Sequence, residues 1–492
     1  MIHDVARPMT SLAKTAVRGA AWNTAASAAR IASALLILPV LARLLDPADF
    51  GIMQVGMPII LFMMLFNDLG IGPALVRADD PSRTFWATAF WTNCAMGSVL
   101  TLIVYVTAGP VADWYDLPRA EPILQALAFA LILNCLAVTP NAWLQRQFRF
   151  RDLALIEITS MVIGMAVAIF SAVRGAGAWA LVWQQLSAFA VKSSLLWLSA
   201  RVPLRFDYDV REIRAVVPFI SNLLGSQVVN FFARNSDNII IARMLGDVAL
   251  GFYAIAYRIM LMPIQFLSWG MTSVLLPTLS TFKSDTARVK AACLRVFRII
   301  ALVTFPAMAG IAALAEPVVV IVLGEAWLPS AAVLALLAPI GALQSLTSAQ
   351  GGMFMALGRT DVLFRYTVLT TIIVIAAFLI GTQYGLVGTA TAYLAANLLL
   401  ALPLFRSLLT LIDANLGDMF QAVGTTALVS TVMGFGVWAL ADELRLGGAS
   451  SLDTLIICIP VGAALYAAGL AALDRPAFGE IVGLGKTLVL RS

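Results

Sequence analysis

Apolar residues run along this chain in long blocks that short polar or charged breaks separate. Blocks such as 122–137, 366–380 and 454–473 hold roughly 15 to 20 residues each, close to what one α-helical bilayer crossing requires. Strands buried in a soluble core are shorter, at about 4 to 8 residues. The pattern therefore predicts membrane-spanning helices, whose backbone groups are satisfied internally within hydrocarbon.

The breaks divide the chain into about fourteen helices, so we expect an all-α integral membrane protein. The loops test this count, because cytoplasmic loops of membrane proteins are enriched in Lys and Arg. These residues gather in every second loop, while the alternate loops carry acids such as Asp113 and Glu316, which places both termini in the cytoplasm. The predicted spans are 15–43, 49–76, 84–109, 120–143, 153–173, 178–200, 213–244, 248–281, 290–323, 330–357, 362–381, 385–410, 419–441 and 452–473.

The chain carries an internal repeat at an offset of 200 residues, at which Arg43 and Gly51 coincide with Arg243 and Gly251. Six predicted helices separate the copies, so both halves enter the membrane in the same direction and form a parallel repeat. We expect two pseudo-symmetric six-helix lobes around a central cavity, followed by two extra helices and a cytoplasmic tail. The predicted boundaries of these three parts are 1–205, 206–412 and 413–492.

Composition supports a membrane protein and narrows its chemistry. Hydrophobic residues make up 61% of the chain and charged residues 12%, against about 25% charged in a typical soluble domain. His3 is the only histidine, which excludes catalysis by a Ser-His-Asp or Cys-His group. We expect no catalytic residue, no metal and no cofactor. Four cysteines in apolar blocks, without CxxC spacing, indicate packing residues: Cys94, Cys135, Cys293 and Cys458.

Six charged residues fall inside predicted spans, where insertion costs about 2.5–3.5 kcal/mol each near the helix centre. They are tolerable only in a hydrated cavity or in mutual pairs, and the cations outnumber the acids. An anionic ligand is therefore expected to complete the site. The candidates are Arg30, Lys192, Arg234 and Arg258 for substrate binding, and Asp68 and Asp237 for ion coupling.

Helical phase places further polar residues beside two of these arginines. Asn23 shares a stripe of the first helix with Arg30 at about 100° per residue. Arg258, Gln265 and Trp269 align within about 60° on the eighth helix. A cation, an amide and an aromatic side chain at helical spacing are typical of a surface that binds sugars. Asn23, Gln265 and Trp269 therefore join the four cations in the predicted substrate site.

Several of these charges also have a structural interpretation that the sequence leaves open. Arg234 and Asp237 are three residues apart and can neutralise one another. Lys192 can snorkel to the interface if its helix is shorter than predicted. Asp68 can cap a helix end. Arg30 and Arg258 have no acid within one turn on their own helices, which favours substrate contact over pairing across helices.

Three motifs resemble one known family. The basic N-terminus leads to LLDPADFG, RNSDNIIIARMLG runs into GFYAIAYRI, and VLGEAW follows later. Over essentially the whole chain, the sequence resembles the polysaccharide-transporter branch of the multidrug/oligosaccharidyl-lipid/polysaccharide (MOP) superfamily. Within that branch it is most similar to exopolysaccharide and O-antigen repeat-unit flippases, including the colanic acid exporter type.

The resemblance implies a flippase of the bacterial inner membrane that works by alternating access. Its substrate would be an undecaprenyl-diphosphate-linked oligosaccharide, carried from the cytoplasmic to the periplasmic leaflet. Membrane lipids and other polysaccharide-assembly proteins would be its partners, and no nucleic acid is expected. Two alternatives of the same fold remain, a cation-coupled drug antiporter and a flippase for peptidoglycan lipid precursors. The lack of an acid in the first helix departs from the antiporter pattern.

Overall fold

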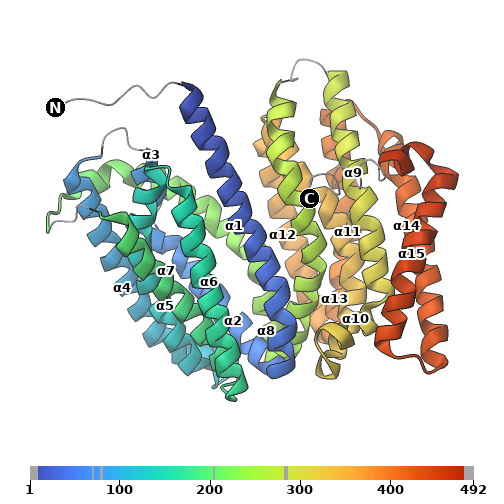
Figure 1. Ribbon diagram of the computed structural model, residues 1–492, viewed down its shortest axis with the longest axis horizontal. Helices are drawn as coiled ribbons and strands as arrows, with labels where there is room; N and C mark the ends of the chain where they lie inside the picture. The colour runs from blue at the N-terminus through green and yellow to red at the C-terminus, as the bar shows by residue number, and fades with distance from the viewer. Residues whose placement is uncertain (1–8, 69–70, 78–80, 203–205, 282–285, 481–492) are drawn as a thin grey trace. The chain divides into compact units, whose positions relative to one another are not determined.

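The computed structural model describes residues 9–68, 71–77, 81–202, 206–281 and 286–480, and in these ranges the chain is helical with no strand (Figure 1). Each predicted span has a helical counterpart, although 49–76 is divided into two helices and 290–323 into another two. The helices are α1 (Met9–Leu44), α2 (Pro47–Asp68), α3 (Ile71–Arg77), α4 (Arg83–Trp114), α5 (Ala120–Arg146), α6 (Phe150–Val173), α7 (Trp179–Ala200), α8 (Val210–Thr281), α9 (Thr286–Ala313), α10 (Ala315–Val322), α11 (Pro329–Ala356), α12 (Thr360–Gly381), α13 (Gly385–Leu411), α14 (Leu416–Leu446) and α15 (Ser451–Leu473), with short 3₁₀ turns at Glu325–Trp327 and Thr382–Tyr384.

Helix α8 contains two of the predicted spans, which meet at Gly246. The backbone of Gly246 leaves the helical region, with φ 82° and ψ −177°. A side chain would clash at this positive φ, and glycine alone adopts it at little cost. The break predicted between 244 and 248 therefore interrupts the helix at Gly246, although the residues on either side of it are helical.

Eleven segments of the described ranges are long and apolar enough to cross a membrane. One of them, 361–411, contains both α12 and α13. The prediction of an all-α, multi-pass membrane protein is confirmed, and the count of fourteen spans stays a prediction.

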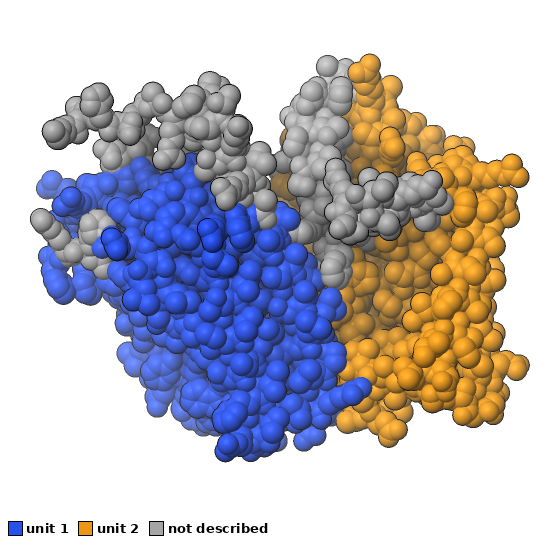
Figure 2. All heavy atoms as spheres, viewed as in Figure 1, with its two compact units in different colours: residues 1–251 blue, residues 252–492 orange. Residues whose placement is uncertain are grey.

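The chain forms two compact units, residues 1–251 and 252–492, which are coloured separately in Figure 2. In the first unit α4 packs on α5, α6 on α7, and α5 on α7. The Trp197 indole N–H donates to the Leu136 carbonyl oxygen at 2.9 Å and so ties α7 to α5. The boundary between the units lies inside α8, and the lobe boundaries at 205/206 and 412/413 remain predictions of the repeat.

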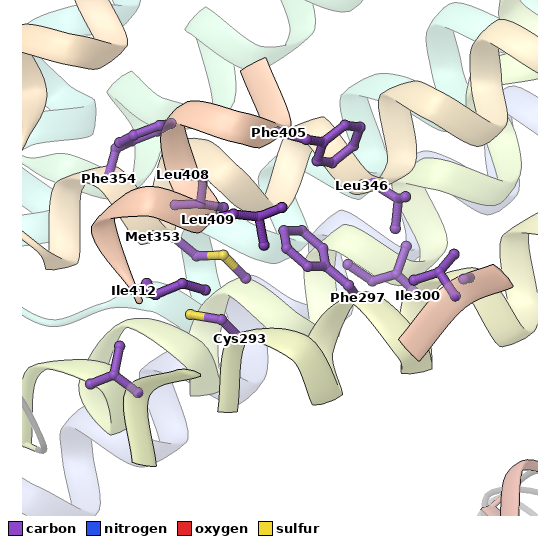
Figure 3. Close-up of a cluster of buried hydrophobic side chains, with 13 residues drawn as sticks. Cys293, Phe297, Ile300, Leu346, Met353, Phe354, Phe405, Leu408, Leu409 and Ile412 are labelled. Atoms are coloured by element: carbon purple, nitrogen blue, oxygen red, sulfur yellow. The ribbon is translucent and has the colours of Figure 1, made fainter. Parts of the chain in front are cut away.

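A buried apolar cluster joins α9, α11, α13 and α14 in the second unit (Figure 3). Phe297 and Phe405 meet edge to face, with ring centroids 6.1 Å apart. The described members of this cluster include Cys293, which is fully buried and serves as a packing residue. Burial of this kind holds helices together through close van der Waals packing, since lipid tails are as apolar as the side chains.

The last two helices pack against α9. The Tyr466 hydroxyl donates to the Leu302 carbonyl oxygen at 2.8 Å, and Arg298 pairs with Asp474 at 2.8 Å. These contacts tie α15 to α9, and α14 packs on α9 as well. That these two helices lie outside the repeat stays a prediction.

Repeat-related residues of the first unit meet at a close helix crossing. A methyl group built on Gly51 would lie 1.8 Å from the Asp247 carbonyl oxygen, and one built on Gly251 would lie 2.1 Å from the Pro47 carbonyl oxygen. Both pairs are related by the same 200-residue offset, so the contact is reciprocal. Glycine is required at both positions because the helix starts touch through their backbones.

Candidate functional site

Arg30 pairs with Glu157, so the acid that the first helix lacks comes from α6. The side chain of Arg30 is 60% exposed and that of Glu157 is 34% exposed. Pairing across helices was one of the two interpretations of Arg30, and it exists in this structure. Because the guanidinium remains largely exposed, an anionic ligand can still reach it.

Arg258 lies on the second half of α8 and is exposed, although its neighbours along the helix are not. Ile255, Ile259 and Met260 are all buried. Arg258 makes no ion pair with any residue in the described ranges. A guanidinium on an otherwise buried stretch of apolar helix is a position where an anion is stabilising.

Arg234 and Asp237 do not neutralise one another in this structure. Arg234 is exposed and forms no ion pair within the described part of the chain. The Asp237 carboxylate accepts the backbone N–H of Asn238 at 2.8 Å and is half-buried. The predicted roles of Arg234 in binding and of Asp237 in coupling stay predictions.

Four other predicted site residues have side chains outside the described residues. They belong to α1, α2 and α8. These residues are Asn23, Asp68, Gln265 and Trp269.

Lys192 lines a cavity of about 530 Å³ in the first unit, between α3, α5 and α7. It is half-buried and forms no ion pair with any described residue. Helix α7 extends to Ala200, as predicted, so Lys192 lies about 12 Å from the helix end at 1.5 Å per residue. That distance exceeds the reach of a lysine side chain, which argues against simple snorkelling.

The lining of the cavity also includes three amides of α5 that were not predicted from the sequence. Asn134, Asn141 and Gln145 all line the space around Lys192. Gln145 donates to the Asn141 side-chain oxygen at 2.6 Å, while the Asn134 amide has no hydrogen-bond partner among the described residues. Their spacing places them within about 40° on one face of α5, a signal that was present in the sequence.

The third wall of the cavity is α3, which Arg146 holds in place. The Arg146 guanidinium donates to the carbonyl oxygens of Leu75 and Val76 at 3.3 and 3.4 Å, at the C-terminal end of α3. A cation near the last carbonyls of a helix satisfies them and is favoured by the helix dipole. The cavity therefore has walls fixed by specific contacts, with Lys192 and the amides as its polar groups.

Comparisons with known proteins identify the family. Residues 40–332 match the family described as polysaccharide biosynthesis protein. The chain is 26% identical to the lipopolysaccharide biosynthesis protein WzxC of Escherichia coli K12 over 392 residues, covering 79% of this chain and 80% of that one. It is 25% identical to the teichuronic acid biosynthesis protein TuaB of Bacillus subtilis over 461 residues, covering 93% and 95%.

Among solved structures, the fold is similar to that of the lipid II flippase MurJ in its inward closed conformation. The TM-score is 0.74 at 14% identity, covering 92% of this chain and 98% of that one. At this identity the likeness shows the fold alone. The family match spans more than half of the chain, and the two relatives span most of it. The chain therefore belongs to the polysaccharide biosynthesis protein family.

Proposed function

We propose that the protein flips an undecaprenyl-diphosphate-linked oligosaccharide repeat unit from the cytoplasmic to the periplasmic leaflet of a bacterial inner membrane. The observation that carries the proposal is Lys192, which forms no ion pair with any described residue and lines a cavity together with three amide side chains of α5. The family supports it, since the relatives WzxC and TuaB are named for the biosynthesis of lipopolysaccharide and teichuronic acid. Both termini would lie in the cytoplasm.

The physics of the substrate sets what the protein has to supply. A diphosphate and its sugars cannot cross hydrocarbon unaided, because each buried charge or unpaired polar group costs several kcal/mol. The polyprenyl tail can stay in the lipid while the head moves through a polar site that opens to one side of the membrane at a time. Cations at positions 30, 192, 234 and 258 would hold the anionic head, and no covalent step is required.

The direct test is deletion of the gene in its own bacterium. Exported polymer is expected to fall at least tenfold, while the lipid-linked repeat unit accumulates and stays protected from a membrane-impermeant glycosidase in spheroplasts. A plasmid copy should restore glycosidase access. If polymer export is unchanged and drug efflux falls, the antiporter alternative holds instead. If lipid-linked peptidoglycan precursors accumulate, the protein is a precursor flippase.

Arg30 provides a second test, because its partner Glu157 is known. Arg30→Ala is expected to lower export at least tenfold, and Glu157→Gln to retain it, since the substrate needs the cation and not the ion pair. The reversed pair, Arg30→Glu with Glu157→Arg, keeps an ion pair across α1 and α6 but removes the cation from α1. Export should stay low. Full recovery in the reversed pair at normal membrane abundance would show that Arg30 is structural.

A further inference from the structure

We propose that the cavity between α3, α5 and α7 is the pocket for the saccharide head of the transported lipid. Lys192 holds an acidic group there, either a phosphate of the carrier or a carboxylate of the glycan, and the amides of α5 hold neighbouring hydroxyls. This inference rests on the proposed function and deepens it by assigning the head to one part of the first unit. It brings in Asn134, Asn141 and Gln145 as binding residues.

The unpaired state of Lys192 is the first step of the argument. Helix α7 is not among the eleven segments apolar enough to cross a membrane, but its block 178–200 is predicted from the sequence to span it. In such a span a lysine ammonium is costly unless an acid, a carbonyl group or water compensates it. In the described part of the chain no carboxylate pairs with it, and the other polar side chains that line the cavity are amides. A neutral amide cannot balance the charge. An anion that enters the cavity would balance the charge of Lys192. The ammonium group would then bind a phosphate or a carboxylate through its compact positive charge.

The amides supply the second step. An amide side chain both donates and accepts hydrogen bonds, as a sugar hydroxyl also does. The Asn134 amide is without a partner in the described ranges, and Asn141 uses its oxygen for Gln145, which leaves its N–H₂ group to donate. Half-buried polar groups left in this state gain free energy when a ligand satisfies them.

The size and walls of the cavity fit the same ligand. Its volume of about 530 Å³ lies within the range of about 300–1,000 Å³ found for small-molecule pockets. Val76, Ala137 and Val138 give it apolar patches, against which the C–H faces of a sugar ring can pack. Asn141 and Gln145 lie in the last two turns of α5, on the side that the loop charges predict to be cytoplasmic, where the substrate would enter.

Binding to the full chain in phosphatidylcholine nanodiscs tests the pocket. The two probes are undecaprenyl diphosphate, which has the anion without sugar, and trigalacturonate, which has acidic sugars without the lipid. The variants are Lys192→Met, and Asn134→Leu combined with Asn141→Leu. Gln125→Leu is the matched control, because this amide is also on α5 but donates to Glu121 at 3.1 Å and does not line the cavity.

We expect Lys192→Met to weaken at least one probe tenfold or more, and Lys192→Arg to recover part of the loss. The probe affected identifies the source of the anion as carrier phosphate or acidic glycan. The double amide variant should weaken trigalacturonate alone, and Gln125→Leu neither probe. If both probes bind Lys192→Met and the double variant as tightly as the wild type, or if the wild type binds neither, the pocket is not the head site. Export by the wild type in cells then still decides the proposed function separately.

Discussion

Gly51→Ala and Gly251→Ala are each expected to destabilise the protein by about 1–3 kcal/mol, the usual cost of overpacking a closely packed site. The added methyl group would meet a backbone carbonyl oxygen at 1.8 or 2.1 Å, and a carbonyl of a helix cannot move aside as a side-chain tip can. The two helix starts must separate instead. Thermal unfolding of the purified protein in detergent measures the effect, and export should fall in parallel.

Gly310→Ala is the control for these substitutions. Gly310 also lies inside a helix, but a methyl group built on it has nothing within 4 Å. Alanine should therefore leave stability unchanged or raise it by up to about 1 kcal/mol, through its higher helix propensity. If Gly51→Ala and Gly251→Ala unfold at the wild-type temperature while Gly310→Ala behaves as expected, the backbone contact at the repeat crossing does not exist.

Arg258→Ala is expected to abolish export, with a loss of at least tenfold, while membrane abundance stays normal. The residue is exposed on a stretch of α8 whose neighbours are buried, and no described carboxylate neutralises it. An anionic substrate is therefore its predicted partner. Arg258→Lys should retain part of the export, because the positive charge remains although the planar guanidinium, which can donate two parallel hydrogen bonds, is lost.

Arg359→Ala serves as the comparison for Arg258. Arg359 is exposed at the start of α12 and already pairs with Asp361 at 3.1 Å. Removing it should change export little, since exposed ion pairs of this kind contribute about 0–1 kcal/mol. Normal export by Arg258→Ala at normal abundance would refute the binding role. A collapse of its abundance would instead indicate that Arg258 is needed for folding and not for binding.

Much of the fold follows from local sequence alone. Apolar blocks bounded by charges predicted helices such as 178–200 and 385–410, which the structure has as α7 and α13 with nearly the same ends. The prediction is weaker inside long blocks. Residues 290–323 were expected as one helix, yet α9 and α10 divide at Leu314, where the backbone leaves regular helical geometry in a sequence as apolar as its surroundings.

The site was predicted less completely. Charges inside apolar spans are conspicuous, so Arg30, Lys192 and Arg258 were found from the sequence. The amides of α5 were not predicted, because a neutral Asn or Gln costs less free energy in a membrane than a charged residue. Their position in a span is therefore a weaker sign of function, even at helical spacing. Only their presence with Lys192 in the lining of one cavity gives them a role.

The sequence by itself determined the membrane class, most helix positions and the family, and it predicts a 200-residue repeat, because each depends on local composition or on alignment along the chain. The tertiary structure decided which side chains meet. Arg30 finds its acid 127 residues away on α6, whereas Arg234 forms no ion pair with the acid three residues along its own helix. In a membrane the lipid-facing and protein-facing sides of a helix are both apolar, so the hydrophobic pattern does not fix how each helix is rotated about its axis. Packing fixes that rotation, and with it every contact of the site.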